Sequence, residues 1–169
     1  MNSYKITANQ LGQYQISRQD QIIGEWIYPK WYAKQSEIRH KDGRVWQVKA
    51  KSFWGNATEI FDAGGSLAEF KMRWNGSMEI QIFKPEQTYR FYFKLKGFWK
   101  TSYLLLDEHR HELCQLYPDM KWNRTHYDFS IETSEEFEQL DAKEIILFAM
   151  IACADYHLKS ISSAAVSAS

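Results

Sequence analysis

Apolar and polar positions alternate along most of the chain. In residues 66–74, an apolar side chain recurs at every second position from Ala68 to Trp74, and charged side chains occupy the positions between them. Residues 44–50 and 88–95 show the same alternation. A period of two is typical of antiparallel strands that bury one face and expose the other to water. The alternation therefore predicts a sheet over most of the chain.

Turn residues divide this region into short strands. Asp42-Gly43 and Asn75-Gly76 are hairpin dipeptides, because two-residue turns of type I′ need positive φ at both central positions. We expect about twelve strands, near residues 4–8, 13–18, 21–28, 31–39, 44–50, 57–62, 66–74, 78–84, 88–95, 100–107, 111–117 and 125–132. A sheet of this many strands leaves long edges unless it closes, so the pattern predicts a closed barrel.

The pattern changes after residue 132, where the sequence carries helix-start signals. Two pairs of residues have the spacing of a capping box: Thr133 with Glu136, and Asp141 with Glu144. They predict a short helix over about 134–139 and a second helix over about 142–160, followed by a frayed tail. Within the second helix, residues 145–154 are apolar on every face, which indicates a helix enclosed on all sides.

A barrel of about twelve strands is wider than its own side chains can fill, because about eight strands already leave little more than side-chain space. We therefore predict that the apolar helix lies inside the barrel. The expected fold class is mainly β: a closed antiparallel barrel of about twelve strands around a buried hydrophobic C-terminal α-helix, as a single domain over residues 1–169. The apolar run at 145–154 is short for a membrane span of about 20 residues, which favours a core helix.

Aromatic residues make up 16% of the chain. We expect most of them to fill the space between the barrel wall and the helix. The seven tryptophans are Trp26, Trp31, Trp46, Trp54, Trp74, Trp99 and Trp122. The alternative is a ligand cavity of the lipocalin type, which requires the helix to pack outside the barrel. The chain would then be a carrier of an apolar small molecule.

The charges change the picture in two ways. The 169 residues include 21 Lys or Arg and 21 Asp or Glu, and this balance argues against a nucleic-acid partner, because proteins that bind nucleic acid are usually strongly basic. The distribution is uneven, however: residues 1–100 hold 16 basic and nine acidic side chains, and residues 101–169 hold five basic and 12 acidic side chains. A protein-interaction module that docks through these opposed halves is a further alternative.

The cysteines and the N-terminus bear on the compartment. Cys114 and Cys153 lie in apolar runs and are expected to be buried and reduced. The first ten residues show neither the basic start nor the apolar stretch of a signal peptide. We therefore expect a cytoplasmic protein, which as a lipid binder would sit peripherally at the membrane.

Basic side chains recur on the polar side of three expected strands. They are Lys49, Lys51, Lys71, Arg73, Lys94 and Lys96. If the barrel brings these strands together, the side chains form a cationic face that suits phosphate groups. We take them as candidate ligand-binding residues for anionic lipid headgroups. The alternative is that they only solvate the sheet and protect strand edges.

Signatures of other chemistry are missing from the sequence. It contains no nucleophile elbow, zinc-protease motif, phosphate loop or dinucleotide fingerprint, so we expect a non-enzymatic protein without a cofactor. His109 and His111 are spaced so that both can point the same way on a strand, as metal ligands sometimes do. Their segment also matches a polar hairpin tip, and no third ligand is indicated. No metal site is therefore predicted.

Four segments spread over residues 14–156 carry a resemblance to a known family. They are YQISRQDQIIGEWIY at 14–28, DAGGSLAEFKMRW at 62–74, KGFWKTSYLLLDEHRHELCQLYP at 96–118 and EIILFAMIACADY at 144–156. The chain resembles the tubby C-terminal-like superfamily, which includes tubby domains, phospholipid scramblases and LURP-one-related proteins. The resemblance implies a twelve-stranded barrel around a central hydrophobic C-terminal helix.

The resemblance also implies a non-enzymatic binding domain. Tubby domains bind phosphoinositide headgroups through Lys and Arg on the barrel surface, and the ligand expected here is phosphoinositide or another anionic lipid. Phospholipid scramblases carry in addition a cysteine-rich acylated stretch and an acidic calcium motif. This chain has isolated cysteines and no spaced acidic loop of the EF-hand type. A scramblase-like membrane protein is therefore the last alternative, after the apolar-ligand carrier and the interaction module.

Overall fold

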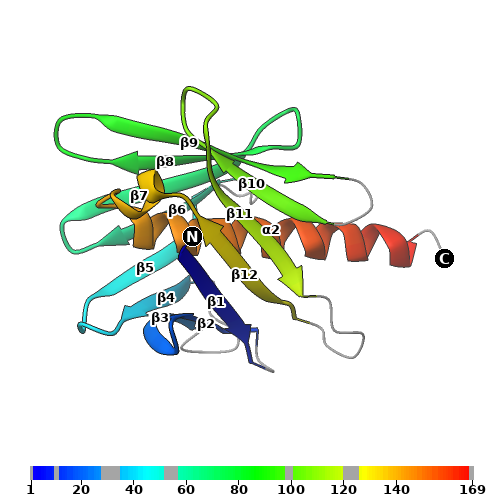
Figure 1. Ribbon diagram of the computed structural model, residues 1–169, viewed down its shortest axis with the longest axis horizontal. Helices are drawn as coiled ribbons and strands as arrows, with labels where there is room; N and C mark the ends of the chain where they lie inside the picture. Colours follow the sequence, from blue (N-terminus) through cyan, green and yellow to red (C-terminus); the bar gives the residue numbers. More distant parts are fainter. Residues whose placement is uncertain are drawn as a thin grey trace.

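The structure, a computed structural model, describes residues 2–9, 12–27, 35–51, 57–97, 101–119 and 126–167. Twelve strands form a closed antiparallel barrel, and two helices follow them in the chain (Figure 1). The strands are β1 (Asn2–Ala8), β2 (Tyr14–Arg18), β3 (Gln21–Ile27), β4 (Gln35–His40), β5 (Val45–Ala50), β6 (Ala57–Asp62), β7 (Gly65–Met72), β8 (Met78–Phe83), β9 (Thr88–Lys96), β10 (Ser102–Leu106), β11 (Glu112–Asp119) and β12 (Asp128–Thr133). The helices are α1 (Glu135–Glu138) and α2 (Lys143–Ser167).

The barrel closes in sequence order. Each strand pairs with its neighbours along the chain, and β1 pairs with β12 with Tyr4 opposite Ile131. The predicted mainly-β closed barrel is therefore confirmed. Parts of the expected strands, at 28, 31–34, 100 and 125, lie outside the described residues.

α2 runs through the interior of the barrel (Figure 1). Every residue from Ile145 to Ala154 is buried, and Ala149 and Ile151, on opposite faces of the helix, have no exposed surface. These residues form one core with the inward side chains of the strands. An all-apolar helix is stable here because the sheet surrounds it, as the sequence predicts. The helix does not pack outside the barrel, as the lipocalin-type alternative required.

The helix and the barrel wall approach each other closely at Gly24 in β3. A Cβ atom on Gly24 would lie 3.1 Å from Cζ of Phe148 and 3.0 Å from the carbonyl oxygen of Arg39. Phe148 belongs to α2 and Arg39 belongs to β4, so Gly24 is close to both the helix and the next strand. Glycine in the middle of a strand is typical of such a close approach. The Phe148 ring therefore occupies the space that a larger side chain at position 24 would need.

The strand β7 ends two residues earlier than the alternation predicts. Arg73 N donates to Ser77 O at 2.8 Å and Gly76 N donates to Arg73 O at 3.1 Å, and these bonds close the β7–β8 turn. Trp74 lies in this turn and is fully exposed. Its expected place on the buried face is wrong, because the turn redirects the chain before that position. Four more residues from the expected buried faces are exposed near strand ends: Ala50, Met72, Tyr89 and Leu95.

The helices also begin and end differently from the prediction. Ser134 is the N-cap of α1, and its Oγ accepts a hydrogen bond from the backbone N–H three residues later at 3.2 Å. Thr133 still belongs to β12, and its Oγ1 donates to Glu138 Oε1 at 2.6 Å. α2 begins at Lys143 and continues to Ser167. The expected end near 160 and the frayed tail before 167 are therefore wrong.

α2 begins at one end of the barrel and emerges at the other, and we call these the proximal end and the distal end (Figure 1). At the proximal end, Lys143 lies beside Lys41 in the β4–β5 turn. At the distal end, Tyr156 lies beside Ala50 and Met72, the last residues of β5 and β7. Because neighbouring strands are antiparallel, all odd-numbered strands finish at the distal end.

By length and composition, α2 over Lys143–Ala164 could cross a membrane, with a mean hydropathy of 1.4. In this structure 61% of that apolar stretch is buried inside the barrel. A core helix passes the same test of length and composition, and the enclosed residues are those that the sequence predicts for a core helix.

Candidate functional site

The six basic residues singled out in the sequence lie on the outside of β5, β7 and β9 or directly after these strands: Lys49, Lys51, Lys71, Arg73, Lys94 and Lys96. β6 lies between β5 and β7, and β8 lies between β7 and β9. The structure therefore does not bring the six together as one continuous row.

Glutamates on β6, β7 and β8 neutralise part of this face. Three ion pairs cross it: Lys49 Nζ to Glu59 Oε2 at 3.4 Å, Lys51 Nζ to Glu69 Oε2 at 2.6 Å, and Arg73 Nε to Glu79 Oε2 at 3.7 Å. A hydrogen bond from Ser66 and the contact with Lys49 lower the pKa of Glu59 despite its partial burial, so this carboxylate stays charged. Sequence reasoning missed these glutamates because it considered one strand at a time.

Lys71, Lys94 and Lys96 differ from the other three. None of them makes an ion pair with a residue in the part of the chain that the structure describes. Lys94 and Lys96 lie at the distal end of β9, and Leu95 between them is 47% exposed. The unneutralised cations of the predicted face thus lie mainly toward the distal end.

Of the eight large apolar side chains that are exposed among the described residues, five lie at the same end, while Ile22, Val45 and Tyr89 lie at the proximal starts of their strands. Trp74 stands at the tip of the β7–β8 turn with 107% relative exposure. The others described there are Met72, Leu95, Tyr156 and Ile161. They come from two strand ends and from the emerging half of α2. Apolar side chains beside free cations are unusual on a surface that faces only water.

The connecting stretches of the sequence differ in charge according to the strand that they follow. The stretches that follow the odd-numbered strands hold seven Lys or Arg and no Asp or Glu; they are 9–13, 28–34, 51–56, 73–77, 97–101 and 120–127. The stretches that follow the even-numbered strands hold four Lys or Arg and nine Asp or Glu; they are 19–20, 41–44, 63–64, 84–87, 107–111 and 134–142. This division by strand parity differs from the division between the first 100 residues and the rest of the chain.

Tryptophan follows the same division in the sequence. Trp26 and Trp46 are buried in the barrel, as expected for core aromatics. The other five occur in stretches that follow odd-numbered strands: Trp31, Trp54, Trp74, Trp99 and Trp122. Each of the five has a Lys or Arg within three positions. Of these five, only Trp74 is among the described residues. The other four lie outside the described residues, so their expected place in the core stays a prediction.

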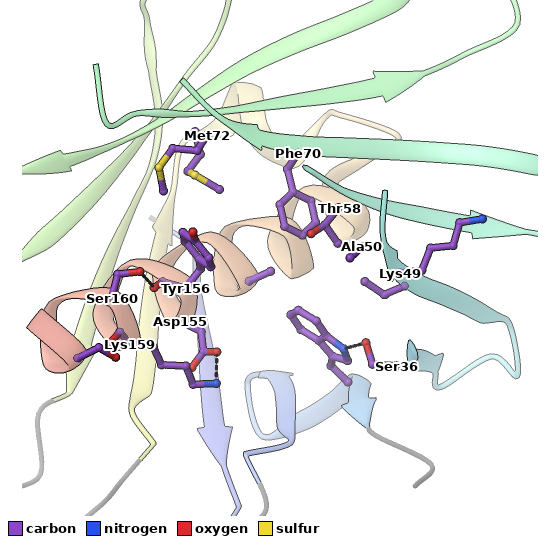
Figure 2. A pocket seen from close by; sticks show the side chains of 15 residues that line it. Ser36, Lys49, Ala50, Thr58, Phe70, Met72, Asp155, Tyr156, Lys159 and Ser160 are labelled. Atoms are coloured by element: carbon purple, nitrogen blue, oxygen red, sulfur yellow. Dashed lines mark hydrogen bonds and ion pairs between the residues drawn. The ribbon is translucent and has the colours of Figure 1, made fainter. Parts of the chain in front are cut away.

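A cavity of about 400 Å³ opens at the distal end between α2 and the barrel wall (Figure 2). Its apolar lining includes Trp26, Val48, Phe70, Met72, Met78 and Tyr156. Asp155 and Lys159 form an ion pair of 2.6 Å at its polar side (Figure 2). The volume lies within the range of about 300–1,000 Å³ that is common for small-molecule sites. The helix therefore lies inside the barrel and still leaves an apolar cavity at one end.

At the proximal end, His40 is buried at the end of β4, and its side chain is only 1% exposed. Its ring packs edge-on against Trp46, with 3.9 Å between the ring centroids. Nδ1 lies 3.1 Å from Glu144 Oε2, but among the described residues neither ring nitrogen has a partner with hydrogen-bond geometry. Burial lowers the pKa of His40, and the opposing charges of Glu144 and Asp42 do not offset burial and the nearby Arg44.

This histidine predicts a loss of stability in mild acid. As the pH falls from about 7 to about 5, the unfolded chain protonates at the ordinary pKa of about 6.5, before the folded protein does. The free energy of unfolding should therefore fall, and His40→Phe should flatten the fall, leaving the contribution of His157, whose pKa burial also lowers. Chemical denaturation at a series of pH values measures this. The control is His109→Gln in the exposed β10–β11 turn. An unchanged slope in His40→Phe would contradict the prediction.

The other residues considered for chemistry in the sequence are two histidines in a turn and two buried cysteines. His109 and His111 lie in the β10–β11 turn, where His111 Nδ1 lies 3.1 Å from Asp107 Oδ2. Across the described ranges, no group of three His, Cys, Asp or Glu could hold a metal ion. Cys114 and Cys153 are both buried, as predicted, and burial raises the pKa of each thiol. These thiols are therefore structural and weakly nucleophilic.

No protein-family model, curated protein or solved structure matches the chain. The resemblance to the tubby C-terminal-like superfamily stays a prediction from the sequence segments.

Proposed function

We propose that this chain is a non-enzymatic binding domain that docks on anionic lipid membranes through the distal end of its barrel. The observation that carries the proposal is Trp74, fully exposed on a turn at the end where Lys94 and Lys96 have no described ion-pair partner. On this proposal the protein is cytoplasmic and binds the membrane peripherally. Membership of the tubby C-terminal-like superfamily is part of the same proposal.

Each part of the distal end suits a lipid surface for a separate physical reason. Tryptophan rings favour the headgroup region, because they combine an apolar body with a polar N–H group. Lysines near an anionic leaflet each contribute about 1 kcal/mol of attraction. Tyr156 and Ile161 of α2, 44% and 51% exposed, add apolar surface where the helix emerges. None of the described residues in the stretches that follow the odd-numbered strands is acidic, so these residues do not repel an anionic lipid.

The outer wall of β5–β8 is the weaker candidate for the lipid contact. Lys49, Lys51 and Arg73 each have a glutamate within 4 Å. A headgroup phosphate would have to displace these carboxylates, whereas Lys94 and Lys96 have none within that distance among the described residues. The proposal therefore keeps the anionic lipid that the sequence predicts and moves the contact toward the barrel end.

Vesicle co-sedimentation tests the proposal. The wild-type protein should bind phosphatidylcholine vesicles only when they also contain phosphatidylserine. Lys94→Glu/Lys96→Glu should weaken this binding by about thirtyfold or more, because two attractions of about 1 kcal/mol are lost and repulsion is added. Salt of about 1 M should remove the difference, because it screens exposed charges beyond about 3 Å. Trp74→Ala should weaken binding at both salt concentrations, since its contribution is apolar.

The matched control is Lys41→Glu/Lys84→Glu, which makes the same change of net charge in exposed proximal turns. We expect it to bind like the wild type. Equal loss in the two double variants would show an effect of net charge alone, and unchanged binding in the distal variant would place the contact elsewhere. Either result would overturn the proposal.

A further inference from the structure

We infer that the distal cavity is a binding site for a single acyl chain with an anionic head, such as a free fatty acid. The inference rests on the proposed function only in that the cavity opens at the end assigned to the membrane. Its own support is the shape and chemistry of the cavity, whose lining comes from α2 and from all six strands β3 to β8 (Figure 2).

The cavity exists because small side chains meet between the helix and the wall at the distal end. Ala50 on β5, Thr58 on β6 and Ala152 on α2 contribute to the lining and leave the space between helix and wall unfilled. Larger side chains at these three positions would close it. A volume of about 400 Å³ suits a chain of medium length and is small for a two-chain lipid.

The larger part of the wall is apolar. Phe70 and Met78 are buried side chains that line the cavity. The indole N–H of Trp26, the only polar group of this side chain, donates to Ser36 Oγ at 2.6 Å. A ligand that enters this part needs no hydrogen-bonding group, which is the property of an alkyl chain.

The polar side of the cavity supplies a cation for the head. Lys159 is 54% exposed, and its ammonium carries three donors, of which the ion pair with Asp155 at 2.6 Å needs one. Asp155 also accepts a hydrogen bond from Tyr14 OH at 2.5 Å, which fixes the carboxylate beside the lysine. The hydroxyls of Ser160 and Ser163 donate to carbonyls of their own helix. Lys159 is thus the group placed to meet a carboxylate head.

The test is a chain-length series of fatty acids from about 8 to about 16 carbons, added below their critical micelle concentrations and without vesicles. Affinity should rise about fourfold with each added CH₂ while the chain enters the cavity, and then level off when the cavity is full. Adsorption on an exposed apolar surface would keep rising with length. Isothermal titration calorimetry measures both stoichiometry and affinity, and we expect one site per chain.

Two variants make the test specific. Ala50→Phe fills the cavity from an exposed strand end and should lower the affinity at least tenfold, whereas Ala57→Phe on the neighbouring strand adds the same side chain away from the cavity lining and should bind like the wild type. Lys159→Gln should lower the affinity for the acid toward that for the alcohol of equal length. Equal affinities in the two phenylalanine variants, or no plateau in the series, would overturn the inference.

The acyl-chain site and the membrane contact can fail separately. Loss of fatty-acid binding in Ala50→Phe with normal vesicle binding supports a distinct cavity site. Normal fatty-acid binding in Lys94→Glu/Lys96→Glu supports it as well. No fatty-acid binding by the wild type, together with intact binding to phosphatidylserine vesicles, would overturn the cavity site and leave the membrane contact standing.

Discussion

Replacing Phe148 by alanine is expected to lower the free energy of unfolding by about 3–5 kcal/mol. The side chain is 1% exposed and packs inside the barrel, where its ring lies against Gly24 and 6.0 Å from the ring of His40. Loss of the ring leaves a cavity, because the closed sheet around the helix cannot readily move inward to fill the space. Since small domains are stable by about 5–15 kcal/mol, this is a large fraction of the total. Guanidinium denaturation followed by tryptophan fluorescence measures it.

Ile161→Ala is the matched control, because Ile161 lies on the same helix where it has left the barrel and is 51% exposed. Its effect should stay within about 0.5 kcal/mol. A double-mutant cycle adds a second check: Gly24→Ala should cost less in the Phe148→Ala background, because the ring that its Cβ would meet is gone. If Phe148→Ala and Ile161→Ala cost the same, the helix is not enclosed.

The barrel and its central helix can be predicted from the sequence because each rests on a local pattern. A strand with one buried face shows alternation within a few residues, and residues 145–154 have no polar face to offer to water. Neither pattern marks the end of an element, however. The alternation continues through Arg73 and Trp74, while the chain has already turned, because the backbone bonds that close the turn leave no trace in side-chain polarity.

The character of the distal end depends on topology as well as on composition. Read along the chain, the charges fall into a basic first part and an acidic last part. Read by strand parity, the stretches that follow the odd-numbered strands contain no acid and five of the seven tryptophans. The residues are visible in the sequence, but they can be grouped in this way only once the bounds and the antiparallel order of the twelve strands are known. The glutamates beside Lys49 and Arg73 were missed for the same reason.

A second group that the sequence does not reveal surrounds Glu138. Its carboxylate accepts hydrogen bonds from Tyr4 OH at 3.0 Å and from Thr133 Oγ1 at 2.6 Å. It also pairs with Arg18 Nη1 at 3.1 Å and with Lys143 Nζ at 3.3 Å. These partners come from β1, β12, β2 and the first residue of α2, so no spacing rule relates them. The cluster ties the closing seam of the barrel to the start of its central helix.

Glu138→Ala is expected to lower the free energy of unfolding by about 3 kcal/mol. Removing one partner from a buried ion pair usually costs about 3–5 kcal/mol. We expect the lower value here, because Arg18 and Lys143 are each about one-third exposed and water can partly replace the lost carboxylate. The hydroxyls of Tyr4 and Thr133 lose an acceptor in a site that is largely dry. Glu136→Ala on the same helix, an exposed glutamate, is the control and should change stability by no more than about 0.5 kcal/mol.

The pH dependence of the Glu138 variants separates charge from shape. Burial alone would raise the pKa of Glu138, but hydrogen bonds from Thr133 and Tyr4 and the charge of Arg18 lower it overall. The folded protein therefore holds this carboxylate ionised more strongly than the unfolded chain does. The stabilisation is fully present above the ordinary glutamate pKa of about 4.3 and is lost as the pH falls through the lower folded value. Glu138→Gln keeps the shape without the charge, so its stability should fall less steeply below about pH 5 than that of the wild type. Parallel curves for the two proteins would mean that the carboxylate is held by packing and not by its charged partners.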